Sequence, residues 1–145
     1  MSRSKRLEVV ERLAQQREDQ AAQALAQVRT QLDVEQKRLD ELFEYQAEYQ
    51  GYLDQQSSQG ISIEQWRRTQ GFIDQLGSLA QRQQNAIDSW RQREQQVLAK
   101  WRELYQKRKN IAQFIGKVSM EELVEADKKE QKAIDELVTQ RFHSN

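Results

Sequence analysis

The sequence predicts an all-α protein: a long antiparallel two-helix coiled-coil hairpin with a shorter C-terminal helix, in a single elongated domain over residues 1–145. Three observations lead to this prediction. Charged residues make up 32% of the chain and Pro is absent, as is typical of long helices. Hydrophobic residues make up only 37%, and the mean hydropathy is −1.02, so a thick globular core is excluded. The apolar residues recur every three or four positions, a regularity that disordered chains lack.

The first helix is expected at about 5–53. From Leu7 to Leu53 most positions at steps of three and four are Leu, Val or Ala, which is the repeat of a coiled coil. The exceptions within this repeat are polar or aromatic: Arg17, Glu35, Gln46 and Tyr49. A helix of about 47 residues is about 70 Å long at 1.5 Å per residue. Such a helix needs a partner to cover its apolar stripe.

The partner is expected from the same chain, after a tip loop at 54–62. The segment DQQSSQG predicts the loop through its Ser and Gly residues. Ser62 and Gln65 then have the spacing of a capping box, with Ile61 and Trp66 placed as a hydrophobic staple. A second long helix is therefore expected at about 63–115.

Charge favours an antiparallel hairpin. Residues 7–53 carry ten acidic and five basic side chains, whereas residues 63–115 carry five acidic and ten basic side chains. Folding back sets opposite charges beside each other, which a parallel homodimer would not do. A turn centred near residues 57 and 58 would place Ala14 near Trp101, Leu25 near Trp90 and Tyr49 near Trp66. The residues expected in the seam between the helices are Leu25, Leu32, Leu39, Trp66, Ile73, Ile87, Trp90, Val97, Trp101 and Leu104.

A third helix is expected at about 120–142. Gly116 suggests a break or a kink, and Ser119 and Glu122 repeat the capping-box spacing. The apolar residues that follow are sparse, so we expect this helix to be weakly packed.

The residue types exclude most kinds of catalytic chemistry. There is no Cys, and the one His, His143, lies next to the C-terminus, so neither a metal site nor a catalytic site is predicted. No nucleotide-binding loop is present, so no cofactor is expected. Lys plus Arg equals Asp plus Glu, at 23 each, which argues against nucleic acid as a partner. No apolar run is long enough for a membrane span or a signal peptide, so we expect no membrane insertion and a cytoplasmic location.

The chain resembles the flagellar export protein FliJ family. The resemblance rests on LFEYQAEYQGYL, then GISIEQW and GFIDQL, followed by a Trp-punctuated, Arg-rich helix, and it covers about residues 5–140. It implies a non-enzymatic coiled coil at the cytoplasmic face of the inner membrane, beneath the flagellar basal body. The implied role is a monomeric central stalk, similar to the rotary ATPase gamma subunit, between the hexameric export ATPase and the cytoplasmic domain of the export gate protein FlhA. Export chaperones are further implied partners.

The resemblance also implies a gate-binding patch near the tip of the hairpin. The matching positions are Leu42, Tyr45, Tyr49, Phe72, Leu76 and Leu79, with Arg38 and Gln83 at its edges. Leu79 is larger than the Ala expected there, and Arg38 and Gln83 replace Gln and His. The spacing of these residues independently indicates an exposed apolar surface on both helices, which usually marks a binding site.

Two other functions remain open from the sequence. One is the equivalent stalk of a virulence-type III secretion system. The other is a generic homo-oligomeric coiled-coil scaffold, which sedimentation as a dimer would favour.

Overall fold

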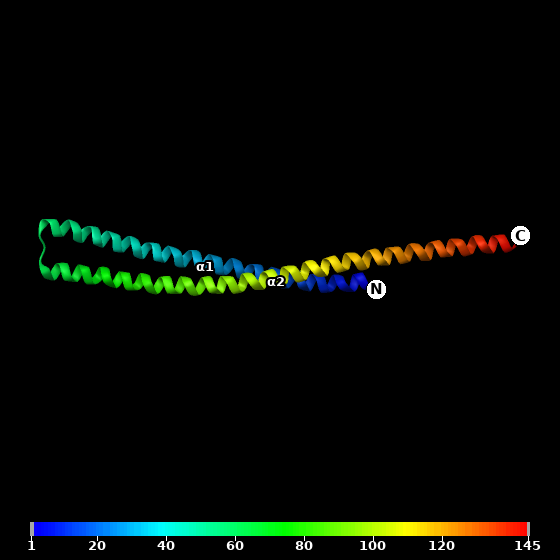
Figure 1. Cartoon of the computed structure of the whole chain (residues 1–145), viewed down its shortest axis with the longest axis horizontal. Coiled ribbons are helices and arrows are strands. Elements are labelled where there is room, and N and C mark those ends of the chain that lie inside the picture. Colours follow the sequence, from blue (N-terminus) through cyan, green and yellow to red (C-terminus); the bar gives the residue numbers. More distant parts are fainter. Residues whose placement is uncertain (1, 145) are drawn as a thin grey trace. The chain divides into compact units, whose positions relative to one another are not determined.

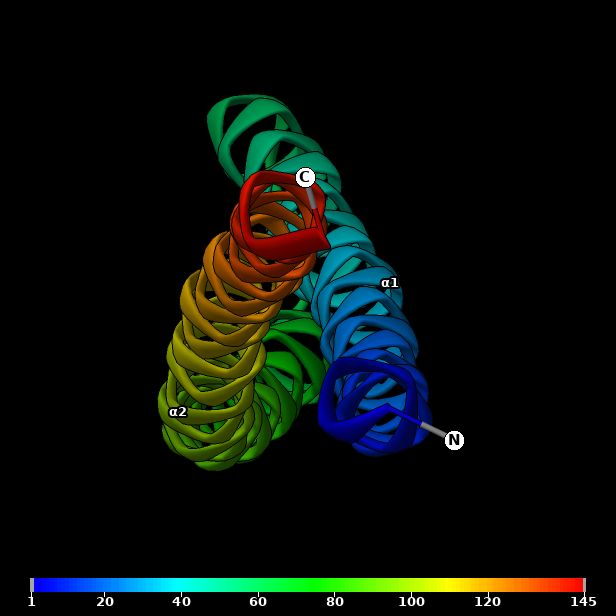
Figure 2. The ribbon, with the colours of Figure 1, turned by 90° about the vertical axis from the view of Figure 1, so that its right-hand side faces the viewer.

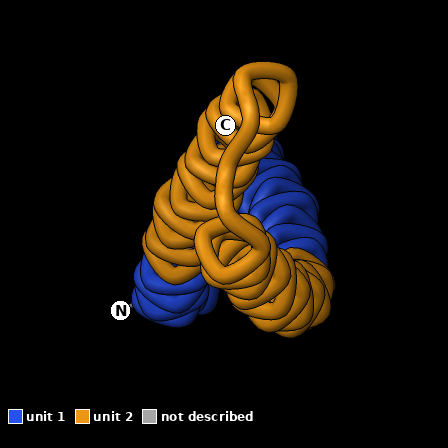
Figure 3. Tube along the Cα trace, turned by 90° about the vertical axis from the view of Figure 1, so that its left-hand side faces the viewer, with its two compact units in different colours: residues 1–21, 101–145 blue, residues 22–100 orange. Residues whose placement is uncertain are grey.

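A computed structural model describes residues 2–144 as two α-helices, α1 (Arg3–Gln59) and α2 (Ile63–Ser144). The predicted all-α class and the two long helices are confirmed. Both helices contribute to two compact units: unit 1 comprises residues 1–21 and 101–145, and unit 2 comprises residues 22–100 (Figure 3). Each unit is described separately below.

Unit 2 is an antiparallel helical hairpin whose two arms meet at a short connection, Gly60 to Ser62 (Figures 1 and 3). The predicted cap at Ser62 is present, since the Gln65 N–H donates to Ser62 Oγ at 3.1 Å. The predicted loop at 54–62 is too long, because α1 continues to Gln59. Gly60 ends α1 with φ of +88°, a conformation that glycine adopts without steric cost. The Ser and Gln residues before it are tolerated in a helix.

The core of unit 2 is one side chain thick. Leu39, Ala80 and Ile87 form its buried cluster, and Leu32 and Leu42 pack against this cluster. Leu53 and Ile87 are the two largest fully buried side chains. The facing residues differ from those expected, since Tyr49 contacts Phe72 and not Trp66. The turn lies a few residues later in the sequence than 57 and 58, and this difference shifts every facing pair.

Unit 1 pairs the start of α1 with the later part of α2 (Figure 2). Ser2 caps α1, since the Lys5 N–H donates to Ser2 Oγ at 3.3 Å. Ser4 binds Glu122 of α2 twice, through its N–H at 3.2 Å and its Oγ at 2.7 Å. These hydrogen bonds lower the pKa of the Glu122 carboxyl, the side-chain bond most strongly. Glu122 therefore satisfies one of the free N–H groups at the start of α1.

The expected break near Gly116 is wrong, and so is a separate helix at 120–142, because α2 is continuous to Ser144. Ile115 and Val118 are both buried, one on either side of Gly116, so packing continues past this residue. Glu122, which the capping box would have turned back toward Ser119, instead binds Ser4. From Leu123 to His143 every side chain is exposed, so the expected weak packing of this segment is present.

Candidate partner-binding face

The candidate site lies on unit 2, on the arms that flank the connection between the helices. Of the exposed apolar side chains on these arms, we call five the tip face: Tyr45, Tyr49, Tyr52, Phe72 and Leu79. Tyr45, Tyr49 and Tyr52 follow one another at helical spacing, so they share one side of α1. Phe72 and Leu79 are two turns apart on one side of α2.

The two helices meet within the tip face through an aromatic pair. The Tyr49 and Phe72 rings lie edge to face, with centroids 4.7 Å apart and an angle of 71° between their planes. This arrangement is favoured by the ring quadrupoles. Both side chains are still more than 40% exposed. The pair therefore stabilises the hairpin while leaving ring surface open to a partner.

Beside the Tyr residues of α1 is an open hollow of about 330 Å³, lined by Tyr45, Glu48, Tyr49 and Tyr52. Tyr52 and Glu48 were not among the residues expected in the patch. Their spacing would have pointed to them, since both lie within one helical turn of Tyr49 and continue the same side of the helix.

One of the expected patch residues, Leu76, belongs to the core instead, and a second, Leu42, packs partly against the core. Leu76 is only 6% exposed, and Leu42 is half-buried against the Leu39–Ala80–Ile87 cluster. Both lie on the side of their helix that faces the other arm. The sequence could not distinguish the side of each helix that faces the other arm from the exposed side next to it, because it does not give the register in which the two arms pair.

The residues expected at the edges of the patch, Arg38 and Gln83, converge on a buried carboxylate. Glu35 is 6% exposed and accepts hydrogen bonds from Gln83 and from Gln31 Nε2, the latter at 2.8 Å. Arg38 forms an ion pair with it at 3.0 Å. The hydrogen bond from Gln83 is the main cause that lowers the pKa of Glu35, followed by the bond from Gln31.

The expected seam residues are unevenly buried. Leu25, Leu39, Ile73 and Ile87 are buried, whereas Leu32, Trp90, Val97, Trp101 and Leu104 are half-buried. Trp66 is 44% exposed, so placing it in the seam was wrong. The aromatic partner of Tyr49 on α2 is Phe72, and Trp66 lies too close to the connection to take that place.

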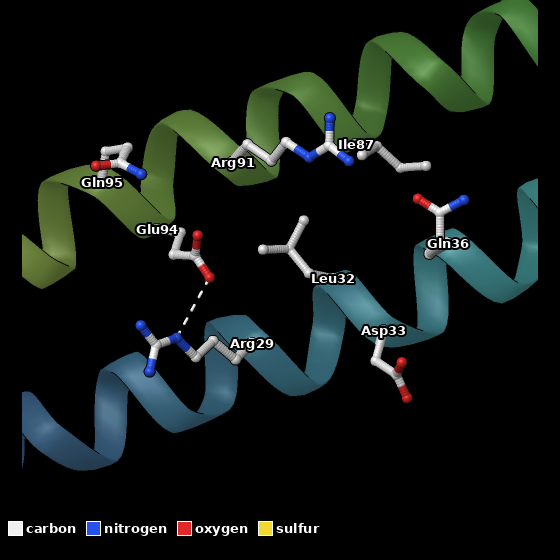
Figure 4. Close-up of a pocket in the computed structure, with 8 residues that line it drawn as sticks. All are labelled: Arg29, Leu32, Asp33, Gln36, Ile87, Arg91, Glu94 and Gln95. Atoms are coloured by element: carbon white, nitrogen blue, oxygen red, sulfur yellow. Dashed lines mark hydrogen bonds and ion pairs between the residues drawn. The ribbon is translucent and has the colours of Figure 1, made fainter.

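A second hollow, of about 410 Å³, lies along the same hairpin (Figure 4). Leu32 of α1 projects between the arms toward α2, and Arg29 Nε donates to Glu94 Oε2 at 3.4 Å across the opening. Arg29 and Glu94 thus link the two arms at this hollow. Exposed ion pairs of this kind contribute little stability.

The described residues contain neither a membrane span nor a metal site. Between residues 2 and 144, no helix is long and apolar enough to cross a membrane. Over the same range, no three His, Cys, Asp or Glu side chains are grouped so that they could hold a metal ion.

Comparison with known proteins assigns the family. The family model described as flagellar FliJ protein matches residues 3–145. The chain belongs to the FliJ family. FliJ-family proteins are non-enzymatic components of the flagellar type III export apparatus, and this chain is accordingly a component of that apparatus. Searches for this FliJ-family chain among curated proteins and among solved structures gave no match.

Proposed function

We propose that this FliJ-family chain is a gamma-like central stalk that links the hexameric export ATPase to the cytoplasmic domain of the export gate protein FlhA. The proposed location is the cytoplasmic face of the inner membrane, beneath the basal body. In this proposal the tip face of unit 2 binds the gate protein, and unit 1, which carries both termini, contacts the ATPase. Export chaperones are further proposed partners.

The observation that carries the proposal is the exposed aromatic surface of the tip face. Tyr45 and Tyr52 are each more than half exposed, on a chain whose mean hydropathy is only −1.02. Aromatic side chains, Tyr above all, are enriched among the residues that dominate binding energy at interfaces. Exposed apolar side chains that lie together on one surface usually mark a binding site.

The proposal predicts that binding and stability respond to different residues. Replacing Tyr45 or Phe72 with Ala should weaken binding of the FlhA cytoplasmic domain by about 30-fold or more, the ratio that about 2 kcal/mol produces. Tyr45→Ala should keep its melting temperature, because truncation of an exposed side chain usually changes stability by about 0.5 kcal/mol or less. Phe72→Ala should lower the stability by about 0.5 to 1.5 kcal/mol, because it removes the ring contact with Tyr49. Ile87→Ala should instead destabilise the hairpin by about 2 to 5 kcal/mol, since Ile87 is only 1% exposed.

Phe43 provides a matched control. It is 51% exposed, against 52% for Tyr45, but it lies about 200° away around α1. Phe43→Ala should leave gate binding unchanged. Binding can be measured by calorimetry and folding by circular dichroism. If Tyr45→Ala and Phe72→Ala melt as early as Ile87→Ala, the tip face is core, and the proposed role of this surface is wrong.

A further inference from the structure

We propose that the hollow lined by Tyr45, Glu48, Tyr49 and Tyr52 receives an arginine side chain of the bound partner. This inference rests on the proposed gate binding and names the chemistry that the tip face recognises. It is carried by three features of unit 2: the composition of the hollow, the charge of the surrounding helix, and the absence of an internal cation at this place.

The hollow combines aromatic faces with a carboxylate. Tyr45, Tyr49 and Tyr52 line an open space of about 330 Å³, and the fourth residue that lines it is the acidic Glu48. All four side chains come from α1 at spacings of one helical turn or less, so a single rigid element positions them. The Tyr49 ring is further fixed by its contact with Phe72. The hollow is therefore ready to receive a side chain before a partner arrives.

The charged residues of α1 around the hollow are all acidic. From Leu39 to Gln59, α1 carries five acidic residues and no Lys or Arg. Two of the five, Asp40 and Asp54, accept hydrogen bonds from Gln36 and Gln50. Within the described part of the chain, the Glu48 side chain has no hydrogen bond or ion pair. Its carboxylate is therefore open to a cation, and the negative potential along this stretch attracts a basic partner surface.

The rest of the chain already places arginine on aromatic rings. In three pairs the guanidinium carbon Cζ of an arginine lies over an aromatic ring. Its distance to the ring centroid is 5.2 Å for Arg93 over Trp90, 5.3 Å for Arg108 over Tyr105, and 5.5 Å for Arg3 over Phe114. The three Tyr residues of the hollow have no such cation among the described residues. A guanidinium group suits the site better than an ammonium group, because its plane stacks on tyrosine while its N–H groups pair with a carboxylate.

The first test measures binding of the FlhA cytoplasmic domain. Glu48→Gln keeps the shape of the side chain and should weaken binding about tenfold, which corresponds to about 1.4 kcal/mol. Glu44→Gln is the matched control, since it removes the same charge one turn earlier but does not line the hollow. It should change binding less than twofold. Tyr45→Phe should bind nearly as well as the original chain, because the aromatic face remains, whereas Tyr45→Leu should bind at least tenfold more weakly.

The second test needs no partner protein. The tyrosine ring signals of the full chain are followed by NMR during titration with N-acetylarginine amide, N-acetyl-lysine amide or the uncharged N-acetylcitrulline amide. Arginine should shift the signals of Tyr45, Tyr49 and Tyr52 more than lysine does, and citrulline should leave them unchanged. Glu48→Gln should reduce the arginine shifts, whereas Glu44→Gln should not.

The outcomes separate the two proposals. If the original chain fails to bind the gate domain but arginine shifts the tyrosine signals, gate binding is wrong and cation recognition stands. If the gate domain binds but Glu48→Gln and Glu44→Gln behave alike, the arginine inference is wrong and gate binding stands. Equal shifts with arginine and citrulline would also overturn the inference.

Discussion

Glu35 illustrates how a single polar residue can determine the pairing of two helices. It occupies a core position of the α1 repeat, where an apolar side chain is the norm, and it is buried. Gln83 of α2 donates both to its side chain and to its backbone carbonyl, the latter at 2.9 Å. A shift of the two arms would remove both bonds from Gln83, at a cost of about 1 to 3 kcal/mol, while Gln31 and Arg38 of α1 would still contact the carboxylate. We expect this contact to favour one register over its neighbours.

The pH dependence of stability tests this role of Glu35. The hydrogen bonds from Gln83 and Gln31 hold its pKa in the folded chain below the ordinary value of 4.5. As the pH falls, the Glu35 carboxyl therefore becomes protonated at a higher pH in the unfolded chain than in the folded chain. The stabilisation by Glu35 is complete above about pH 4.5 and is lost as the pH falls through the lower folded-state pKa. At neutral pH, Glu35→Gln should lower the free energy of unfolding by about 1 to 3 kcal/mol.

The measurement is urea unfolding of both proteins between about pH 7 and pH 3. The difference between the original chain and Glu35→Gln should shrink toward acid pH. Glu122, whose pKa is also lowered, is present in both proteins and cancels in the difference. The exposed Glu41→Gln serves as the control. A difference that stays constant over the whole pH range would mean that ionised Glu35 does not stabilise the fold.

At the scale of the helices, two glycines with opposite conformations explain where the chain turns and where it does not. Gly60 has a positive φ and ends α1, whereas Gly116 has a helical conformation in the interior of α2. A Cβ atom at either position would meet nothing within 4 Å. Backbone conformation alone therefore determines how replacement by alanine changes the stability at each of these two positions.

Gly116→Ala should stabilise the protein by about 0.5 to 1 kcal/mol, since alanine loses less conformational entropy than glycine in a helix. Gly60→Ala should destabilise it by about 1 to 2 kcal/mol, because alanine is strained at positive φ. Thermal unfolding followed by circular dichroism measures both effects, and each variant is the control for the other. Destabilisation by Gly116→Ala would show that α2 departs from helical geometry at this residue.

For the molecule as a whole, the proposed division of work between the units predicts the effect of a truncation. The segment 123–145 is the part of unit 1 to remove, because its described side chains are exposed, whereas Ile115 and Val118 are buried and Glu122 binds Ser4. A chain ending at Glu122 should keep its thermal stability and its affinity for the gate domain. It should stimulate the export ATPase less than the full chain.

The control for this truncation is Tyr45→Ala in the full chain, which should lose gate binding and keep ATPase stimulation. Full stimulation by the truncated chain would show that residues 123–145 are not the ATPase contact. The two measurements together separate the roles of unit 1 and unit 2.

The assembly state distinguishes a stalk from a generic scaffold. The hairpin buries its apolar stripe within one chain, so at micromolar concentration we expect sedimentation as a monomer of 17.2 kDa. The same measurement on the chain ending at Glu122 is the control, since it removes the exposed apolar residues of the later part of α2. A stable dimer of the full chain would favour a homo-oligomeric scaffold.

The sequence by itself determined the helices, their antiparallel pairing and the start of α2. These features depend on local properties: the three-and-four spacing of apolar residues, opposite net charges, and the cap at Ser62. The spacing and the family resemblance also pointed to Tyr45, Tyr49 and Phe72, which are exposed in the structure, but not to Tyr52.

The tertiary structure decided which side of each helix is covered and where each helix ends. Whether α2 breaks at Gly116 depends on Ile115, Val118 and Glu122 finding partners in unit 1, and local patterns carry no information about such contacts. The burial of Leu76 and the exposure of Trp66 likewise follow from the exact pairing of the arms. Neighbouring registers keep almost the same apolar repeat in contact, so they differ mainly in specific contacts such as that between Glu35 and Gln83.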